Sequence, residues 1–156
     1  MNETVLCISG GGSFEQLLAD LRQQFPDTRC YDGHKRQLGA ASVVATAGTL
    51  LFFSLPPNAS RTLGEFEAAL VAVEQQHGVR RAGICELMTG LIHYPHLVAS
   101  VLHGTYQLLA PATLLGKEVP MFTHNMETPP NVLLIMRMLG PPWTETHLFA
   151  FVRRER

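Results

Sequence analysis

The amino-acid sequence predicts an α+β fold, with a mixed or mainly antiparallel sheet and about four helices that pack largely on one of its faces. Three observations support this prediction. Segments with strand and helix patterns are mixed without the regular alternation of a doubly wound fold. No linker, repeat or low-complexity segment divides the 156 residues, so a single globular domain is expected to span residues 1–156. Residues 85–116 contain one acidic side chain and no lysine or arginine, which is typical of a buried segment and places the core there.

The N-terminal segment is predicted to form a strand, a glycine-rich turn and a helix. Residues 4–9 are mostly apolar or β-branched, as buried strands are. Consecutive glycines follow, and Ser13 with Gln16 has the pattern of a helix N-terminal capping box. Apolar residues then recur at helical spacing until Pro26 ends the helix.

The next region is predicted to form a loop and a hairpin. Residues 27–37 are polar and indicate a loop or an exposed edge. Two short apolar runs follow, at residues 42–46 and 49–55, and predict two paired strands. The uncharged run from Leu38 to Leu55 is near the minimum length for a transmembrane helix, but Ala47–Gly48 interrupts it, so a hairpin is the better interpretation.

A second helix is predicted after the hairpin. Thr62 and Glu65 form another capping-box pattern, apolar residues follow at helical spacing, and Gly78 ends the helix. Residues 79–82 are predicted to be a short connection or strand that leads into the central segment.

The central segment is predicted to contain two successive helices. Its first apolar residues follow the spacing of one helix face: Ile84, Leu87, Met88, Leu91 and Ile92. Pro95 restricts the backbone of Tyr94, so the first helix is expected to end there. The same proline suits the first turn of a second helix, which Gly104 ends.

The C-terminal third is predicted to consist mainly of strands. Residues 106–110, 117–122 and 147–152 are short, largely apolar runs with strand character. Residues 132–139 fit either a helix or a strand. A helix is favoured because residues 128–130, Thr-Pro-Pro, have the pattern of a helix start.

Composition narrows the classes of function. Charged residues are 16% of the chain, against roughly 25% in typical soluble domains, which favours either self-association or a compact monomer with few surface charges. The net charge of −1, with no basic run before Arg153, argues against nucleic-acid binding. Cys7, Cys30 and Cys85 lack metal-binding spacing and indicate free thiols in a reducing cytoplasm. No signal-peptide pattern is present at the N-terminus, and no membrane association is expected.

Gly10, Gly11, Gly12 and Ser13 are predicted to be a ligand-binding loop. Glycines after a strand allow the backbone to approach a ligand closely, and the helix N-terminus beyond them attracts a phosphate or carboxylate group. The loop matches neither the complete dinucleotide-binding fingerprint nor the P-loop. The alternative is a tight strand-to-helix turn in which Ser13 is an ordinary N-cap.

Glu86, His93 and His124 are candidates for acid–base catalysis. Glu86 is the only acid in a largely apolar stretch, so its pKa is expected to be raised. It shares a helix face with Thr89 and His93, although two helical turns, about 10 Å, separate Glu86 from His93, so they could only flank one ligand. His124 is expected in a loop between a strand and a helix. The alternative is a solvent-facing polar stripe on a surface helix.

Three histidines raise the question of a metal site. His93 and His96 have a His-x-x-His spacing that zinc or nickel could use, and His103 follows. Pro95 is expected to break the helix between the first two. No metal site is therefore predicted, and the sequence indicates no cofactor.

The leading hypothesis is a small soluble, non-enzymatic domain that binds a protein partner or a small ligand and forms a homo-oligomer, because no complete catalytic motif is present. One alternative is a small enzyme with an acid–base pocket built from Glu86, His93 and His124. Another is a sensor that holds a small anionic phosphate ligand at Gly10–Ser13 and is stabilised by nucleotides.

Overall fold

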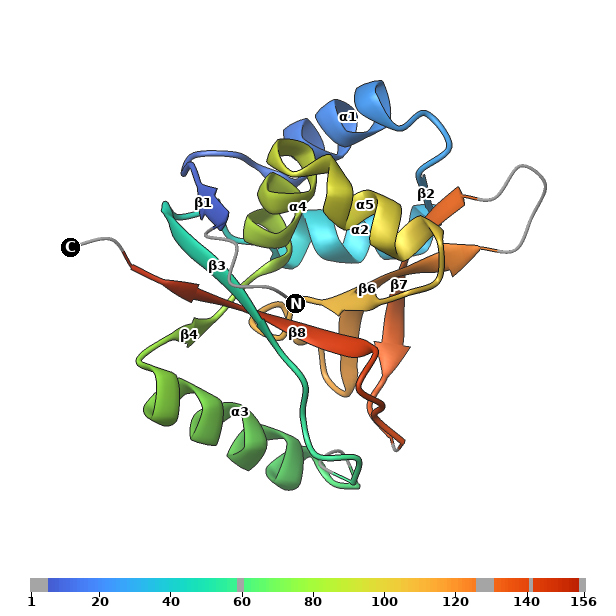
Figure 1. The fold of residues 1–156 in the computed structure, drawn as a ribbon. Helices are drawn as coiled ribbons and strands as arrows, with labels where there is room; N and C mark the ends of the chain where they lie inside the picture. Colours follow the sequence, from blue (N-terminus) through green and yellow to red (C-terminus); the bar gives the residue numbers. More distant parts are fainter. Residues whose placement is uncertain (1–5, 59–60, 126–130, 141, 155–156) are drawn as a thin grey trace.

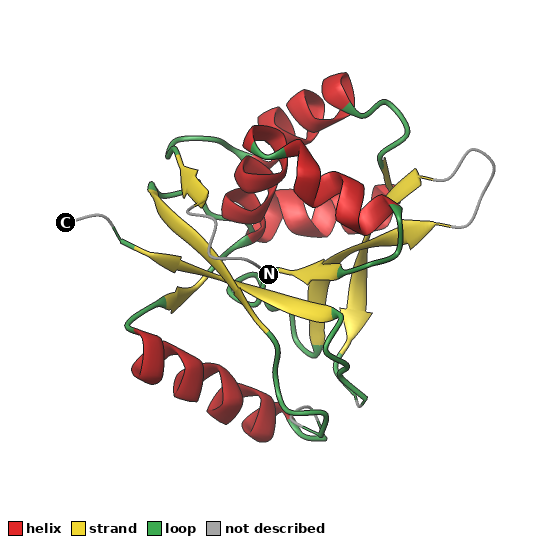
Figure 2. Ribbon diagram, in the orientation of Figure 1, coloured by secondary structure: helices red, strands yellow, loops and turns green. Residues whose placement is uncertain are grey.

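The structure is a computed structural model that describes residues 6–58, 61–125, 131–140 and 142–154. Within these residues the chain forms an eight-stranded mixed sheet and five helices, which confirms the predicted α+β class with one helix more than expected. Figures 1 and 2 show helices on both sides of the sheet.

The strands run in an order that differs strongly from their order in the chain. They are β1 (Leu6–Ile8), β2 (Arg29–Cys30), β3 (Gly48–Phe53), β4 (Arg80–Arg81), β5 (Gln107–Leu109), β6 (Glu118–Asn125), β7 (Asn131–Met138) and β8 (His147–Arg153). In space the order is β1-β3-β8-β5-β6-β7-β2, and β4 pairs with β8 outside this path. β5 is parallel to β8 and β2 is parallel to β7, whereas the other pairs are antiparallel.

Four helices cover one face of the sheet and one covers the other (Figure 1). The helices are α1 (Phe14–Gln24), α2 (Asp32–Ala41), α3 (Leu63–His77), α4 (Ile84–His93) and α5 (Pro95–Leu102). The buried apolar side chains of α1, α2, α4 and α5 belong to one core cluster. Those of α3 belong to a second cluster on the opposite face, together with Trp143, Phe149 and Phe151.

Helix α4 forms the centre of the larger core. Every residue from Ile84 to Leu91 is buried, so the helix is enclosed on all sides rather than on one apolar stripe. It lies close to β3, because a Cβ atom at Gly90 would meet the Leu50 Cδ2 atom at 2.5 Å. The prediction that the charge-poor segment forms the core is therefore confirmed for α4. The predicted breaks at Tyr94 and Gly104 are confirmed as well, since α5 begins at Pro95 and Gly104 has a positive φ of 74°.

Strand β8 pairs with three other strands, more than any other described strand of the sheet. Along one side it pairs with β3, from Phe149 to Arg153. Along the other side, its first residues pair with β5 and its later residues pair with β4. Residues 147–152 were predicted to be a strand, and the structure confirms this and places that strand in the interior of the sheet.

The predicted hairpin at residues 42–46 and 49–55 is wrong. Residues 42–47 form neither helix nor strand, and β3 pairs instead with β1 and β8. The polar segment 27–37, predicted to be a loop or edge, contains the edge strand β2 and the first turns of α2. Helix α2 has no apolar stripe because Leu38 is its only buried residue, so hydrophobic periodicity could not reveal it.

The helix favoured for residues 132–139 is also wrong, because these residues belong to strand β7. Val132, Leu134 and Met136 face the larger core, whereas Ile135 packs with the second core on the other face. Both faces of the sheet are apolar here, which hides the two-residue alternation that normally distinguishes a strand. The predicted helix start at residues 128–130 lies outside the described residues.

Helix ends follow the predicted capping residues with one difference. The Thr62 hydroxyl accepts a hydrogen bond from the Glu65 amide at 3.1 Å, and Gly78 ends α3 with a left-handed φ of 63°. Ser13 is the N-cap of α1, but its side chain forms no capping hydrogen bond.

Candidate functional site

A cavity of about 320 Å³ lies between the glycine loop and helices α1 and α4. Gly10, Gly11 and Gly12 line one side of it, and Ser13 is the N-cap just beyond them. The two helices contribute the polar side chains of Gln16 and Asp20 from α1 and of Thr89 and His93 from α4, together with the apolar Leu17 and Ile92. The structure therefore brings the predicted glycine loop and the predicted His93 together in one place. We call this the glycine-loop cavity.

The shape of the glycine loop is fixed by the segment that precedes β3. The Gly11 amide donates to the Ala45 carbonyl at 2.9 Å, and the Ala45 amide donates to the Gly12 carbonyl at 3.1 Å. Gly11 has a positive φ of 96°, and a Cβ atom at Gly10 would meet the Ala47 nitrogen at 3.1 Å. These glycines are thus required by the close approach of two backbone segments, whatever else the loop does.

The glycine-loop cavity lies between the start of α1, which favours negative charge, and a carboxylate, which favours positive charge. The first amides of a helix have no partners within the helix, and the Ser13 side chain does not satisfy those of α1. Farther along α1, the carboxylate of Asp20 lines the same cavity. A ligand that fits both features must carry an anionic or acceptor group and also hydrogen-bond donors.

Glu86 has a structural role that its position in the sequence does not reveal. Its buried carboxylate accepts hydrogen bonds from the Arg80 guanidinium at 2.5 Å and 3.2 Å, and from the Gly83 amide at 2.8 Å. The amide and hydroxyl of Thr46 donate to it at 3.1 Å and 2.5 Å. Burial raises the pKa of Glu86, but these hydrogen bonds outweigh burial, so its pKa lies below the ordinary value. The prediction of a raised pKa is wrong because the apolar stretch meets a cation from another element.

The three acid–base candidates occupy separate places. Glu86 lies in the first turn of α4 and binds Arg80, whereas His93 lies in the last turn and lines the glycine-loop cavity. His124 is not in a loop: it belongs to β6, where it pairs with Val132 of β7. Strands β3, β8 and β5 separate β6 from the edge strand β1 that leads to the glycine loop.

The remaining histidines and cysteines form no metal centre in the part of the chain that the structure describes. No group of three or more metal-binding side chains occurs among the described residues. His96 lies beside Tyr94, with ring centroids 6.1 Å apart, and His103 is the C-cap of α5. Cys85 is buried, and burial raises the pKa of its thiol, which disfavours the nucleophilic thiolate.

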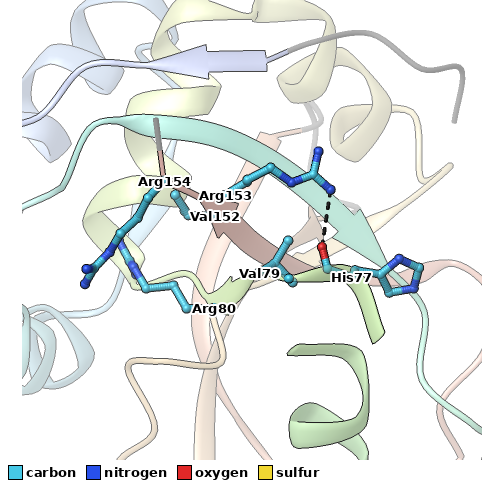
Figure 3. A pocket seen from close by; sticks show the side chains of 7 residues that line it. His77, Val79, Arg80, Val152, Arg153 and Arg154 are labelled. Carbon is cyan, nitrogen blue, oxygen red and sulfur yellow. Dashed lines mark hydrogen bonds between the residues drawn. The ribbon is translucent and has the colours of Figure 1, made fainter. Parts of the chain in front are cut away.

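A larger cavity that the sequence interpretation missed, about 740 Å³, lies where the end of α3 meets β4 and the end of β8 (Figure 3). Arg80, Arg153 and Arg154 line it with His77, and we call it the arginine cavity. The residues are far apart in the sequence and meet because β4 pairs with β8, Arg80 lying opposite Val152. The pairs Arg80-Arg81 and Arg153-Arg154 were visible in the sequence, but nothing there predicted that they would be neighbours.

Comparisons of the chain with models of protein families, with curated proteins and with solved structures find no match. Among the described residues, no helix has the length and apolar character needed to cross a lipid bilayer. The glycine-loop cavity and the arginine cavity therefore provide the basis for the proposals that follow.

Proposed function

We propose that this protein is a non-enzymatic binding domain that holds a small polar ligand in the glycine-loop cavity. The observation that carries the proposal is the meeting of the glycine loop, Asp20 and His93 around one cavity of about 320 Å³. This volume lies at the lower end of the range for small-molecule sites, about 300–1,000 Å³. The surrounding contacts are mostly polar, so the ligand is recognised by hydrogen bonds rather than by apolar burial.

The chemistry of the cavity favours a ligand with two kinds of polar group. A carboxylate or phosphate group suits the start of α1, because the Ser13 side chain leaves the first helix amides uncapped. Hydroxyl or ammonium groups suit the Asp20 carboxylate, and the imidazole of His93 and the amide of Gln16 can donate or accept. Amino acids and phosphorylated or acidic sugars have both features.

Thermal unfolding in the presence of such compounds tests the proposal. A ligand at a hundred times its Kd stabilises the folded state by about 2.7 kcal/mol, which raises the Tm of a domain of this size by about 5–10 °C. Asp20→Asn and His93→Gln are expected to abolish the shift for the active compound. The matched control, Asp27→Asn, changes an exposed carboxylate outside the cavity and is expected to preserve it.

Two results would contradict the proposal. One is the absence of any shift across amino acids, sugar acids and sugar phosphates. The other is a shift that Asp20→Asn and His93→Gln leave intact, because the compound would then bind elsewhere.

The alternatives from the sequence make different predictions in the same experiment. A phosphate sensor that uses Gly10–Ser13 alone would respond to nucleotides equally in wild type and Asp20→Asn, whereas the proposed ligand also needs the Asp20 carboxylate. An acid–base enzyme would require Glu86 as a proton donor or acceptor, yet its carboxylate already accepts hydrogen bonds from Arg80, Gly83 and Thr46. The lining of the cavity thus favours a ligand that contacts Asp20 and His93 as well as the glycine loop over either alternative.

Self-association is a second proposal, and exposed valines favour it. Val43 and Val44 are 80% and 50% exposed in the segment that leads to the glycine-loop contact at Ala45. We propose that a second copy of the chain covers them. Light scattering after size-exclusion chromatography is expected to show a dimer that Val43→Ser with Val44→Ser converts to a monomer. A monomeric wild-type protein at high concentration would contradict this.

A further inference from the structure

We propose that the arginine cavity is a second site, which binds a small phosphorylated molecule. The proposal is independent of the ligand in the glycine-loop cavity, because none of the residues lining one cavity lines the other. It rests on the arrangement of charge, on the shape of the cavity and on the pairing of β4 with β8.

The cationic side chains surround the cavity from different elements. Figure 3 shows Arg80 of β4 and Arg154, which follows β8, extending toward one side of the cavity, and Arg153 of β8 extending toward His77 on the other. The Arg153 guanidinium donates to the His77 carbonyl at 3.4 Å, which holds it beside the end of α3. Val79 and Val152 lie between the two sides and give the cavity an apolar floor.

Two of the nearby carboxylates bind Arg81, which does not line the cavity. Glu67 and Glu74 pair with Arg81 at 2.7 Å and 3.1 Å. Glu86 pairs with Arg80, so that arginine is partly neutralised. Among the residues that the structure describes, no acidic side chain lines the cavity and neither Arg153 nor Arg154 has an ion pair. The cavity therefore concentrates positive charge in a protein whose net charge is −1.

Guanidinium groups and cavity size together indicate the class of ligand. The planar guanidinium fork matches the oxygen atoms of a phosphate group, and it stays charged at all physiological pH values. A volume of about 740 Å³ accommodates a molecule of nucleotide size, with its non-phosphate part against Val79 and Val152. Three arginines line this cavity, which is too few for the broad phosphate contacts of a long nucleic-acid backbone, so that is not the ligand that we infer.

Isothermal titration calorimetry with inorganic pyrophosphate and ADP tests the proposal. Wild-type protein is expected to bind both, and Arg153→Gln with Arg154→Gln is expected to weaken binding by about tenfold or more. The control, Lys35→Gln with Arg36→Gln, removes the same charge from exposed positions of α2 and is expected to retain wild-type affinity. Asp20→Asn is also expected to retain it, which separates this site from the proposed function.

Several outcomes would overturn the proposal. They are the absence of pyrophosphate and ADP binding, equal weakening in the α2 control, and far tighter binding of a short single-stranded oligonucleotide, which would make the ligand a polymer. If the double variant fails to fold, Arg154→Gln alone replaces it, because Arg154 is exposed and has no ion pair among the described residues. Unchanged affinity in Arg154→Gln would then count against the site.

Discussion

At the scale of single residues, the contact between Arg80, Glu86 and Thr46 connects separate parts of the fold. It joins β4 to the start of α4 and to the segment that holds the glycine loop. Removing one member of a buried ion pair lowers the free energy of unfolding, because the remaining charge stays in a poorly solvated environment without its partner. The contact thus links the structural core to both cavities.

Glu86→Gln is expected to destabilise the protein by about 3 kcal/mol, the lower end of the range for breaking a buried pair. The lower end applies because the Arg80 side chain is 30% exposed. Urea unfolding at neutral pH measures the change. Glu67→Gln is the control, because Glu67 is 42% exposed in its pair with Arg81, and a change above about 1 kcal/mol there would contradict the reasoning.

The same carboxylate is expected to make stability depend on pH in the acid range. The folded-state pKa of Glu86 is lowered, so its contribution is complete above the unfolded value of about 4.3 and is lost as pH falls through the folded value. Chemical unfolding at a series of pH values below about 5 should show a smaller loss of stability in Glu86→Gln than in wild type. Identical pH profiles would show that the pair contributes nothing.

His147 is expected to make stability depend on pH in a higher range than Glu86 does. Burial, and the positive charge of Arg137, lower its pKa, and its Nδ1 atom accepts a hydrogen bond from the Thr144 amide at 3.1 Å. The neutral ring is therefore favoured in the folded state, and its contribution is present above about pH 6.5 and is lost as pH falls below that value. His147→Gln should flatten the stability profile between about pH 5 and 7, and a profile identical to that of wild type would contradict this.

At the scale of elements, two glycines show how packing decides the effect of the same substitution. A Cβ atom at Gly48 would lie 2.6 Å from the Arg153 carbonyl oxygen, where β3 pairs with β8 and the backbone cannot move aside. Gly48→Ala is expected to destabilise by about 2 kcal/mol or more. Gly33 in α2 has no atom within 4 Å of such a Cβ, so Gly33→Ala is expected to stabilise by about 0.5–1 kcal/mol. Thermal unfolding of both variants measures the two effects. A Gly48→Ala protein as stable as wild type would contradict the close pairing of β3 with β8.

The elements that the sequence predicted well are those with local signals. Thr62 and Gly78 bound α3, and Pro95 separates α4 from α5, because capping and proline chemistry act within a few residues. β7 was missed since its pattern depends on two cores that lie on opposite faces of the sheet. α2 was missed because its packing against α1 uses Gly39, where a Cβ atom would meet the Glu15 Oε1 atom at 2.6 Å, rather than an apolar stripe.

At the scale of the whole molecule, the candidate sites depend on contacts that no local pattern contains. The glycine loop and His93 were identified singly, but their meeting requires the packing of α1 on α4. Asp20 carried no signal, since an exposed acid on a helix is ordinary. The arginine cavity requires the pairing of Arg80 with Val152, which are distant in the chain. The sequence therefore provided candidate residues, and the topology decided which of them share a site.

The central place of β8 has a consequence for how the chain is made. This strand follows all the others in the sequence, yet it joins β1 and β3 on one side to β5, β6 and β7 on the other. As the ribosome releases the chain from its N-terminus, the two halves of the sheet have no common strand until residues 147–153 emerge. A nascent chain that pauses before these residues is therefore expected to expose the apolar faces of both halves of the sheet.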